Sequence, residues 1–322
     1  MIEQCSEEER WDSGVLERAG HPLQLWGWGE IKARGNWRVE RVICKENGQI
    51  VGLAQLLLRP LPGPFKCLAY VPRGPVAALS NREEVLKSLA EYAKDTFGAV
   101  SLLVEPDWDD MPPLTNWRKA PNPILLARTI ILDLKKTDDE LLADMTKKTR
   151  QYIRKSEKSG VEVRFAKTTE DIAGCLKIYK QTAKRAGFAL HDDGYYEAIF
   201  DKLGSNSQVL MAMHQGRVVA FLWLVVSSET AFELYGGMND EGQELRANYI
   251  LKWTAIQKTK EWGIGRYDMN GLLNDGVSQF KQGFSNHETH LAGSYELPLS
   301  PLYGIWAKGL PTAKKIVRRI RK

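Results

Sequence analysis

The sequence predicts an α/β (α+β) protein that contains the same structural unit twice, and three observations support this fold class. Predicted strands and helices alternate along the whole chain, which is the pattern of α/β folds. The order of β-hairpin, helix and strand occurs once in each half, although the halves share no obvious residue identity. The length of 322 residues allows two domains, and 43% apolar and 26% charged residues are typical of a globular chain.

The first half begins with a β-hairpin and ends with a buried strand. Apolar stretches at 39–44 and 50–58 flank Asn47 and Gly48, which favour a tight turn. Further strands are expected at 67–71, 76–78 and 99–104, with a helix over 82–97. A polar, proline-rich stretch follows.

The second half repeats this order. Strands are expected at 128–134, 161–165, 209–214, 218–226, 231–235 and 266–269. Helices are expected at 138–159, 172–186, 195–203 and 247–262. We expect the first of these helices to break near Lys148. Thr168 or Thr169 is expected to cap the second helix, and Gly216 is expected to form a hairpin turn.

The net charge of +5 is the sum of two basic segments and an acidic remainder. Residues 307–322 contain seven basic residues and no acidic one, which gives +7; residues 145–164 contain seven basic and two acidic residues, which gives +5. Subtracting both from the total leaves −7 for the rest of the chain. The two basic segments are therefore the places where a polyanion could bind.

Several kinds of site and protein are disfavoured. The four cysteines (Cys5, Cys44, Cys67 and Cys175) have neither CxxC spacing nor a histidine pairing, so we expect reduced thiols and no metal site. The first ten residues are acidic and polar, unlike a signal peptide, and the longest apolar runs, such as 218–226, are too short to cross a bilayer. We therefore expect a soluble, cytoplasmic protein.

The first candidate site is the basic helix that contains residues 147–158. Helical spacing places Lys147, Arg150, Arg154 and Lys158 on one face and Ile153 on another. Such a face is either simply solvated or binds phosphates, including those of nucleic acid.

The second candidate is Lys281, which lies between Phe280 and Phe284. A strand that ends in polar residues and glycine, 266–271, precedes it, and α/β proteins bind ligands at such strand ends. Lys281 therefore lies either in the wall of a cleft or on the surface between packed aromatic rings.

Three further features give weaker signals. Gly236 and Gly237 follow an apolar strand and either let a substrate approach the backbone or form a turn. His191, on the same helical face as Tyr195, either contacts an anion or caps a helix. The basic C-terminal segment, 314–322, carries a short apolar stripe, so it either lies on an anionic membrane or is a solvated end.

The order of elements resembles that of acyl-CoA acetyltransferases, but the motif that holds pyrophosphate is missing. At 243–248 neither of the expected glycines is present, which disfavours coenzyme A. The sequence also has no Walker A, GxSxG, HExxH or dinucleotide-binding motif.

Taken in order, the segments resemble the Fem (FemABX) family of aminoacyl-tRNA-dependent ligases that build peptidoglycan bridges. The matching segments are 25–37, 148–161, 185–188, 234–237, 249–271, 280–284 and 298–303. The resemblance implies two acetyltransferase-like (GNAT-like) domains, one of residues 1–136 plus a returning segment 297–322, the other of residues 137–296. It is closest to compact FemX-like members, without the long coiled-coil arm of some relatives.

The resemblance also implies the activity. Such an enzyme is a non-ribosomal peptidyltransferase that moves an aminoacyl group from tRNA to the stem-peptide side-chain amine of lipid II or UDP-MurNAc-pentapeptide. It implies no cofactor beyond aminoacyl-tRNA as co-substrate, a monomer, and peripheral contact with the inner face of the plasma membrane through the basic C-terminal helix. Two alternatives stay open: a tRNA-dependent transferase with another peptide or lipid acceptor, and a non-catalytic relative that binds membrane or RNA.

Residue roles follow from the same resemblance. Lys281 and Glu105 are expected to be catalytic, the first as a cation at the acyl donor and the second near the acceptor amine. Substrate binding is expected from Lys32, Trp37, His191, Tyr195, Tyr235 and Phe280, and tRNA binding from Lys147, Lys148, Arg150, Arg154 and Lys158. His191 stands where FemX-like members have an arginine for the diphosphate, and histidine is a poorer phosphate ligand.

Overall fold

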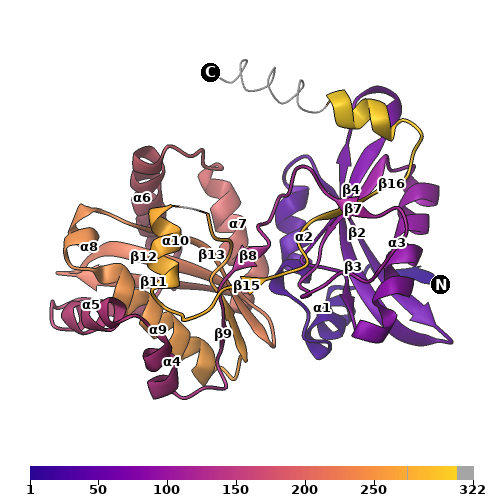
Figure 1. The fold of residues 1–322 in the computed structure, drawn as a ribbon. Helices are drawn as coiled ribbons and strands as arrows, with labels where there is room; N and C mark the ends of the chain where they lie inside the picture. Colours follow the sequence, from indigo (N-terminus) through magenta and orange to yellow (C-terminus); the bar gives the residue numbers. More distant parts are fainter. Residues whose placement is uncertain (274, 310–322) are drawn as a thin grey trace. The chain divides into compact units, whose positions relative to one another are not determined.

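The computed structural model describes residues 1–273 and 275–309, which form two compact units (Figure 1). Unit 1 contains residues 1–18, 32–125 and 291–309, and unit 2 contains residues 19–31 and 126–290. Each unit is a mixed sheet with helices packed on it, so the predicted α/β class is confirmed. No helix among the described residues has the length and apolar character needed to cross a membrane.

Unit 1 contains one large sheet. Its strands are β1 (Ile2–Gln4), β2 (Arg38–Glu46), β3 (Gln49–Pro60), β4 (Cys67–Pro72), β5 (Val76–Ala77), β6 (Ser101–Glu105), β7 (Arg118–Lys119) and β16 (Tyr295–Pro298). The helices are α1 (Glu8–Glu17) and α3 (Arg82–Phe97), while α2 (Trp26–Ala33) spans residues of both units. The strand order is β1-β2-β3-β4-β6-β16-β7, with β5 also paired to β3. The pair β4–β6 is parallel and the other neighbours are antiparallel.

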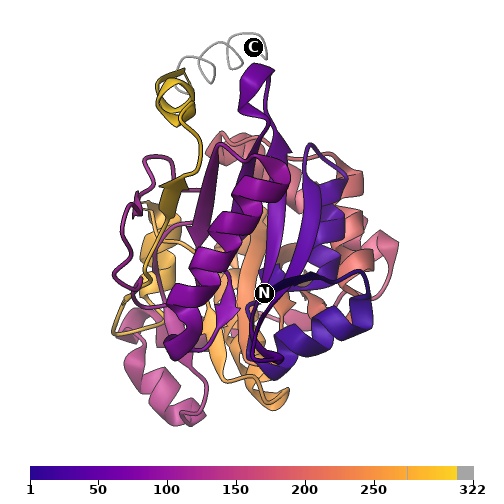
Figure 2. The ribbon, with the colours of Figure 1, turned by 90° about the vertical axis from the view of Figure 1, so that its right-hand side faces the viewer.

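The core of unit 1 follows from strand alternation. Leu56 in β3 packs in the cluster that contains the apolar face of α3, whereas its neighbour Leu57 packs with Tyr70 in a separate cluster. The helix presents Val85, Leu89 and other residues at helical spacing to the sheet. Figure 2 shows the ribbon of α3 in purple, in front of the strands of this sheet.

Unit 2 contains a second sheet and most of the helices. Its strands are β8 (Arg128–Thr129), β9 (Ile131–Asp133), β10 (Glu162–Phe165), β11 (Ser207–His214), β12 (Arg217–Val226), β13 (Thr230–Met238), β14 (Arg266–Asp268) and β15 (Thr289–His290). Its helices are α4 (Asp138–Asp144), α5 (Lys147–Glu157), α6 (Thr169–Ala186), α7 (Asp193–Leu203), α8 (Asp240–Glu244), α9 (Ala247–Glu261) and α10 (Gly276–Gln282). The sheet order is β10-β11-β12-β13-β14-β9, and β8 pairs with β15 separately. Figure 1 shows α6 and α9 on opposite faces of this sheet.

Six strands of the unit 1 sheet correspond to the six strands of the unit 2 sheet. In unit 1 the series β1-β2-β3-β4 is antiparallel, a crossover through α3 adds the parallel strand β6, and β16 pairs antiparallel with β6; β5 and β7 are additional. In unit 2 the series β10-β11-β12-β13 has the same arrangement, with α9 leading to the parallel strand β14 and β9 antiparallel to it. The duplication inferred from the rhythm of the sequence is therefore visible in the topology.

The unit boundaries lie at other residues than those we predicted. Residues 126–136 belong to unit 2 because β9 pairs with β14, and residues 19–31 also pack there. The returning C-terminal segment joins unit 1 from residue 291 onward, where β16 pairs with β6.

One local expectation is confirmed and two differ. The long basic helix breaks near Lys148 as predicted, at residues 145–146, because the Thr146 side chain caps α5 by accepting from the Thr149 N–H. Gly236 and Gly237 lie inside β13 and not beyond its end. Helix α7 begins at Asp193, so His191 precedes it.

Candidate active site

A cavity of about 460 Å³ lies in unit 2, where β13 faces the first half of α9 and helix α10. We call it the donor pocket, because Lys281, which the family resemblance places at the acyl donor, lines it. Its walls are largely apolar, with a few polar groups. Among the lining residues are Glu233, Tyr235, Lys252, Asn270, Phe280 and Lys281.

Lys281 is held at the wall of the donor pocket by backbone carbonyl groups. Its Nζ donates to the carbonyl oxygens of Gly271, at 3.1 Å, and Asn270, at 3.3 Å. Asn270 has a positive φ of 61°. Its side-chain NH2 group donates to the Glu233 backbone carbonyl at 3.0 Å, and its side-chain oxygen accepts from the Gly271 N–H at 2.6 Å. This turn therefore fixes the ammonium group, which has three N–H donors in all.

A buried ion pair lies beside Lys281. The Lys252 ammonium and the Glu233 carboxylate are 2.5 Å apart, with side chains only 4% and 7% exposed. The Tyr267 hydroxyl donates to the same carboxylate oxygen at 2.8 Å. Burial lowers the pKa of Lys252, an effect that the Glu233 charge opposes and the charge of nearby Lys281 increases. The pocket thus has a second lysine, paired with a buried carboxylate, close enough to Lys281 for the two positive charges to repel.

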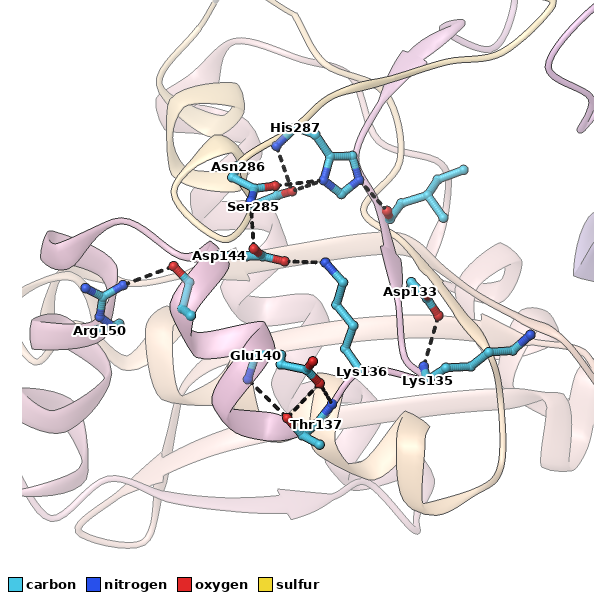
Figure 3. Close-up of polar contacts among 12 residues, drawn as sticks. Asp133, Lys135, Lys136, Thr137, Glu140, Asp144, Arg150, Ser285, Asn286 and His287 are labelled. Atoms are coloured by element: carbon cyan, nitrogen blue, oxygen red, sulfur yellow. Dashed lines mark hydrogen bonds and ion pairs between the residues drawn. The ribbon is translucent and has the colours of Figure 1, made fainter.

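The end of α10 is anchored against the basic helix. The Thr146 N–H donates to the Gly283 carbonyl at 2.9 Å, and a Cβ atom at Gly283 would lie 2.4 Å from the Thr149 hydroxyl. Only glycine fits there, which explains the glycine two residues after Lys281. Figure 3 shows the next residues held as well: Asn286 donates to Asp144 at 2.6 Å, and a His287 ring nitrogen lies 3.1 Å from the Ile131 carbonyl oxygen.

The structure divides the basic residues predicted for tRNA into two groups. Lys147, Lys148, Arg154 and Lys158 are exposed. Arg150 is half-buried instead, and its guanidinium donates to the Leu142 carbonyl at 3.0 Å and to that of Met145 (Figure 3). Arg150 therefore holds the end of α4 and differs from the other four.

Predicted acceptor residues form an aromatic cluster next to the donor pocket. His191 stacks on Tyr195 with ring centroids 4.0 Å apart, and the Tyr195 and Tyr235 hydroxyls share a hydrogen bond. Burial raises the pKa of Tyr195 to about 12 and that of Tyr235 well above its usual value, so both remain neutral donors at physiological pH. Tyr235 and Phe280 also line the pocket with Lys281.

The remaining predicted residues lie in unit 1. Glu105 ends β6 and is 1% exposed; its carboxylate accepts from Tyr70 at 2.5 Å, from Ser294 at 2.5 Å, and from the N–H groups of Ile124 and Leu125. Trp37 packs on Tyr70 with centroids 6.0 Å apart.

Lys32 lies in the last turn of α2. Burial lowers its pKa from 10.5 to about 8. It is therefore still a cation at neutral pH, and an anionic ligand would favour that charged form.

Comparison with known proteins identifies the family. The FemAB family matches residues 15–111, 120–217 and 213–308. This chain belongs to the FemAB family. A lipid II:glycine glycyltransferase of Staphylococcus aureus is 29% identical over 398 aligned positions, which cover 94% of each chain. The family predicted from the ordered motifs is thus confirmed.

Solved structures agree with this fold. The crystal structure of FemX matches with a TM-score of 0.83 at 20% identity, over 94% of this FemAB protein and 99% of that chain. A tandem GNAT protein from the clavulanic acid pathway matches with a TM-score of 0.54 at 10% identity, over 94% and 99% of the two chains. The predicted pair of GNAT-like domains is confirmed at the level of fold.

The alignment also bears on the size of this FemAB protein. The alignment with the glycyltransferase spans 398 positions, whereas this chain has 322 residues. The glycyltransferase therefore contains segments that this chain lacks. The longest helix that the structure describes, α6, has 18 residues. This agrees with the compact form predicted from the sequence.

Sequence reasoning missed the buried Lys252–Glu233 pair. The signal was present: Lys252 falls on the apolar face of its helix, in line with Ala255 and Ile256, and Glu233 interrupts an apolar strand. A lysine and a glutamate that both occupy core positions predict a buried ion pair.

Proposed function

We propose that this FemAB protein is an aminoacyltransferase that builds the peptidoglycan interpeptide bridge, with aminoacyl-tRNA as donor and the stem-peptide amine of a peptidoglycan precursor as acceptor. Its membership of the family and the lipid II:glycine glycyltransferase among its relatives support this function. The single observation that carries the assignment to a site is the donor pocket, with Lys281 fixed at its wall.

The chemistry needs alignment more than activation, because the tRNA ester is already reactive. The acceptor amine attacks the ester carbonyl carbon, a C–N bond forms, the bond to the ribose oxygen breaks, and that oxygen leaves with a proton as the free tRNA hydroxyl. The other proton released by the ammonium passes to a base or to water. Lys281 is placed to stabilise the oxyanion of the tetrahedral intermediate, since its charge is fixed before the reaction starts.

Lys252 and Glu233 act on Lys281 without touching the reacting atoms. Asn270 connects them, because its side-chain amide donates to the backbone carbonyl of Glu233 and its backbone carbonyl accepts from Lys281. We assign the pair, together with Asn270, to positioning Lys281.

The acceptor is assigned to two groups of residues. Lys32 and Trp37 in unit 1 would bind the precursor, with Lys32 facing its diphosphate. His191, Tyr195 and Tyr235 in unit 2 offer an imidazole and two neutral hydroxyl groups for substrate binding.

Glu105 is assigned to positioning and not to proton removal. Its carboxylate already accepts from the hydroxyls of Tyr70 and Ser294 and from two backbone N–H groups. A carboxylate used in this way orders the segment around residues 124–125, and little of its lone-pair capacity is left for an acceptor ammonium.

We propose that the four exposed residues of the basic helix, Lys147, Lys148, Arg154 and Lys158, bind tRNA. Arg150 is assigned a structural role, because it holds the end of α4. Peripheral membrane contact through the basic tail also remains a proposal, since residues 310–322 lie outside the described part of the chain.

The test is a transfer reaction with a mixture of charged tRNAs and three separate acceptors: lipid II, UDP-MurNAc-pentapeptide and a phospholipid. Mass spectrometry of each acceptor identifies the amino acid added. We expect an aminoacyl adduct on a peptidoglycan precursor, and the first two arms separate the lipid-linked from the soluble form. An adduct on the phospholipid alone would replace this acceptor with a lipid headgroup, and no adduct on any acceptor would refute the proposal.

A further inference from the structure

We propose that one end of unit 1 docks on an anionic bilayer, and that the acceptor is therefore the lipid-linked form of the precursor. Two segments form this surface, which we call the tip: residues 59–66, where β3 leads into β4, and the helical residues 303–309. The choice of acceptor rests on the proposed function, whereas membrane binding by the tip can be tested without any transfer activity.

The two segments of the tip are in direct contact. The rings of Phe65 and Trp306 pack on each other with centroids 5.7 Å apart. Figures 1 and 2 both show the helical segment, in yellow, at the end of unit 1 where the chain turns from β3 to β4. This segment is anchored to the sheet by Tyr303, whose hydroxyl donates to the Glu296 carboxylate in β16 at 2.7 Å. Both segments are therefore held at one place on the surface of unit 1.

The tip exposes apolar side chains to solvent. Ile305 is 65% exposed, and Phe65 and Trp306 are half-buried. Pro62 and Pro64, at the turn, are exposed as well. Proline has no backbone N–H, so a turn that contains two prolines has fewer donors to remove from water when it enters a bilayer surface. A tryptophan beside apolar groups is typical of the boundary between lipid and water.

Cations border these apolar groups. Arg59, Lys66 and Lys308 are exposed, and none of the three forms an ion pair with another of the described residues. The two stretches of sequence that supply the tip, 47–82 and 297–322, contain no acidic residue, and the second has seven basic residues. Basic groups around an apolar centre complement an anionic lipid surface, because the apolar groups enter the boundary layer while the cations bind headgroups.

A bilayer matches this composition better than a nucleic acid or a second copy of the chain. RNA would bind the cations but would gain nothing from Ile305 or the prolines, since only aromatic faces stack on bases. The rings of Phe65 and Trp306 already pack on each other. A second copy would bring the same positive charges together. An anionic bilayer uses both the apolar and the charged groups of the tip.

The tip adjoins a residue that we assigned to the acceptor. The Arg59 guanidinium lies 5.6 Å from the centre of the Trp37 ring, and Trp37 packs on Tyr70. A lipid-linked precursor presents its diphosphate at the bilayer surface, whereas a nucleotide-linked precursor is free in solution. A precursor site next to a membrane contact serves the first of these, so we infer the lipid-linked acceptor.

The direct test is sedimentation of the full chain with vesicles of equal parts phosphatidylglycerol and phosphatidylcholine. Ile305→Ser removes the exposed apolar group, and Lys66→Gln removes a cation of the tip. The matched controls lie away from Gly98, the C-cap of α3 over which the Lys66 side chain lies: Leu79→Ser, at a leucine 77% exposed before the N-terminus of α3, and Lys87→Gln, at an exposed lysine of that helix. We expect Ile305→Ser to weaken partitioning about tenfold and Lys66→Gln about fivefold, while each control changes it less than about twofold.

A fluorescent label reports whether the tip itself enters the lipid. The environment-sensitive dye NBD is attached to Ile305→Cys and, as the control, to Leu79→Cys; the native cysteines are buried or half-buried. We expect NBD emission to rise and shift to the blue on addition of the vesicles for Ile305→Cys only.

Three results would overturn the tip as a membrane contact. The first is a wild type that does not bind the vesicles. The second is vesicle binding that Ile305→Ser leaves unchanged, without a change in NBD emission, which would assign the contact to the basic tail alone. The third is a change in NBD emission on addition of tRNA but not of vesicles, which would replace the lipid with RNA.

The transfer assay separates this inference from the proposed function. If both hold, Ile305→Ser raises the KM for lipid II in vesicles and leaves the KM for UDP-MurNAc-pentapeptide unchanged. An unchanged KM for lipid II refutes the role of the tip alone, and transfer only to UDP-MurNAc-pentapeptide refutes the lipid-linked acceptor. Vesicle binding that depends on Ile305, without transfer to any acceptor, supports the tip and refutes the function.

Discussion

Replacing Lys252 by methionine should destabilise the protein by about 3 kcal/mol, because the change leaves a buried carboxylate without its cation. The Lys252 and Glu233 side chains are 4% and 7% exposed and their charged atoms are 2.5 Å apart. After the substitution the Tyr267 hydroxyl, at 2.8 Å, still donates to Glu233 but cannot balance its charge. Methionine is similar in size to lysine, so a cavity contributes little to the loss.

The assay is urea unfolding of the wild type, of Lys252→Met and of the double variant Lys252→Met/Glu233→Gln. In the single variant the buried Glu233 carboxylate lacks its cation, and in the double variant its charge is removed as well. Adding Glu233→Gln, which keeps an acceptor for Tyr267, should restore most of the lost stability.

The matched control is Lys260→Met in the same helix. Its partner, Asp138, is 3.0 Å away, and the two side chains are 31% and 43% exposed. Exposed pairs of this kind contribute under about 1 kcal/mol. The reasoning fails if Lys252→Met costs no more than Lys260→Met, or if the double variant is no more stable than Lys252→Met alone.

Three further predictions concern activity. Lys281→Ala should lower kcat by about 100- to 1,000-fold with an unchanged circular dichroism spectrum, and undiminished transfer would remove its catalytic role. Equilibrium binding of UDP-MurNAc-pentapeptide should weaken up to about tenfold per pH unit above pH 8, because Lys32 loses its charge there. Lys32→Arg should abolish this decline. If the affinity of Lys32→Arg has the same pH dependence as that of the wild type, another group titrates. Glu105→Gln should cost about 1–3 kcal/mol in urea unfolding, since the NH2 group of the glutamine would face hydrogen-bond donors, while the pH profile of kcat keeps its shape. Loss of the acidic limb of that profile would make Glu105 the general base.

Most of the fold could be predicted because it depends on local patterns. The hairpin of β2 and β3, the helix α3 ended by Gly98 and the strands β11 and β12 all follow from apolar periodicity and turn residues. The pairing of β9 with β14 and of β16 with β6 cannot be predicted from such local patterns, because each pair joins segments far apart in the sequence. The unit boundaries depend on these pairings.

The candidate site shows the same division. Lys281 could be found because two phenylalanines flank it and a polar strand end precedes it. Arg150 could not be distinguished from Arg154, since both fit the same helical face and only the contact with the end of α4 separates them. Likewise, the left-handed backbone of Arg246 and the position of its guanidinium over the Tyr152 ring could not be predicted from the sequence.

The measurement that tests the central claim most directly is a single-turnover reaction with aminoacyl-tRNA labelled in the amino acid. Label on the tRNA and label on the peptidoglycan precursor are counted in the same time course. We predict that each aminoacyl group lost from tRNA appears on the precursor in an amide bond, and that Lys281→Ala slows both changes equally. Loss of label from tRNA by hydrolysis, with none on the precursor, would contradict the account.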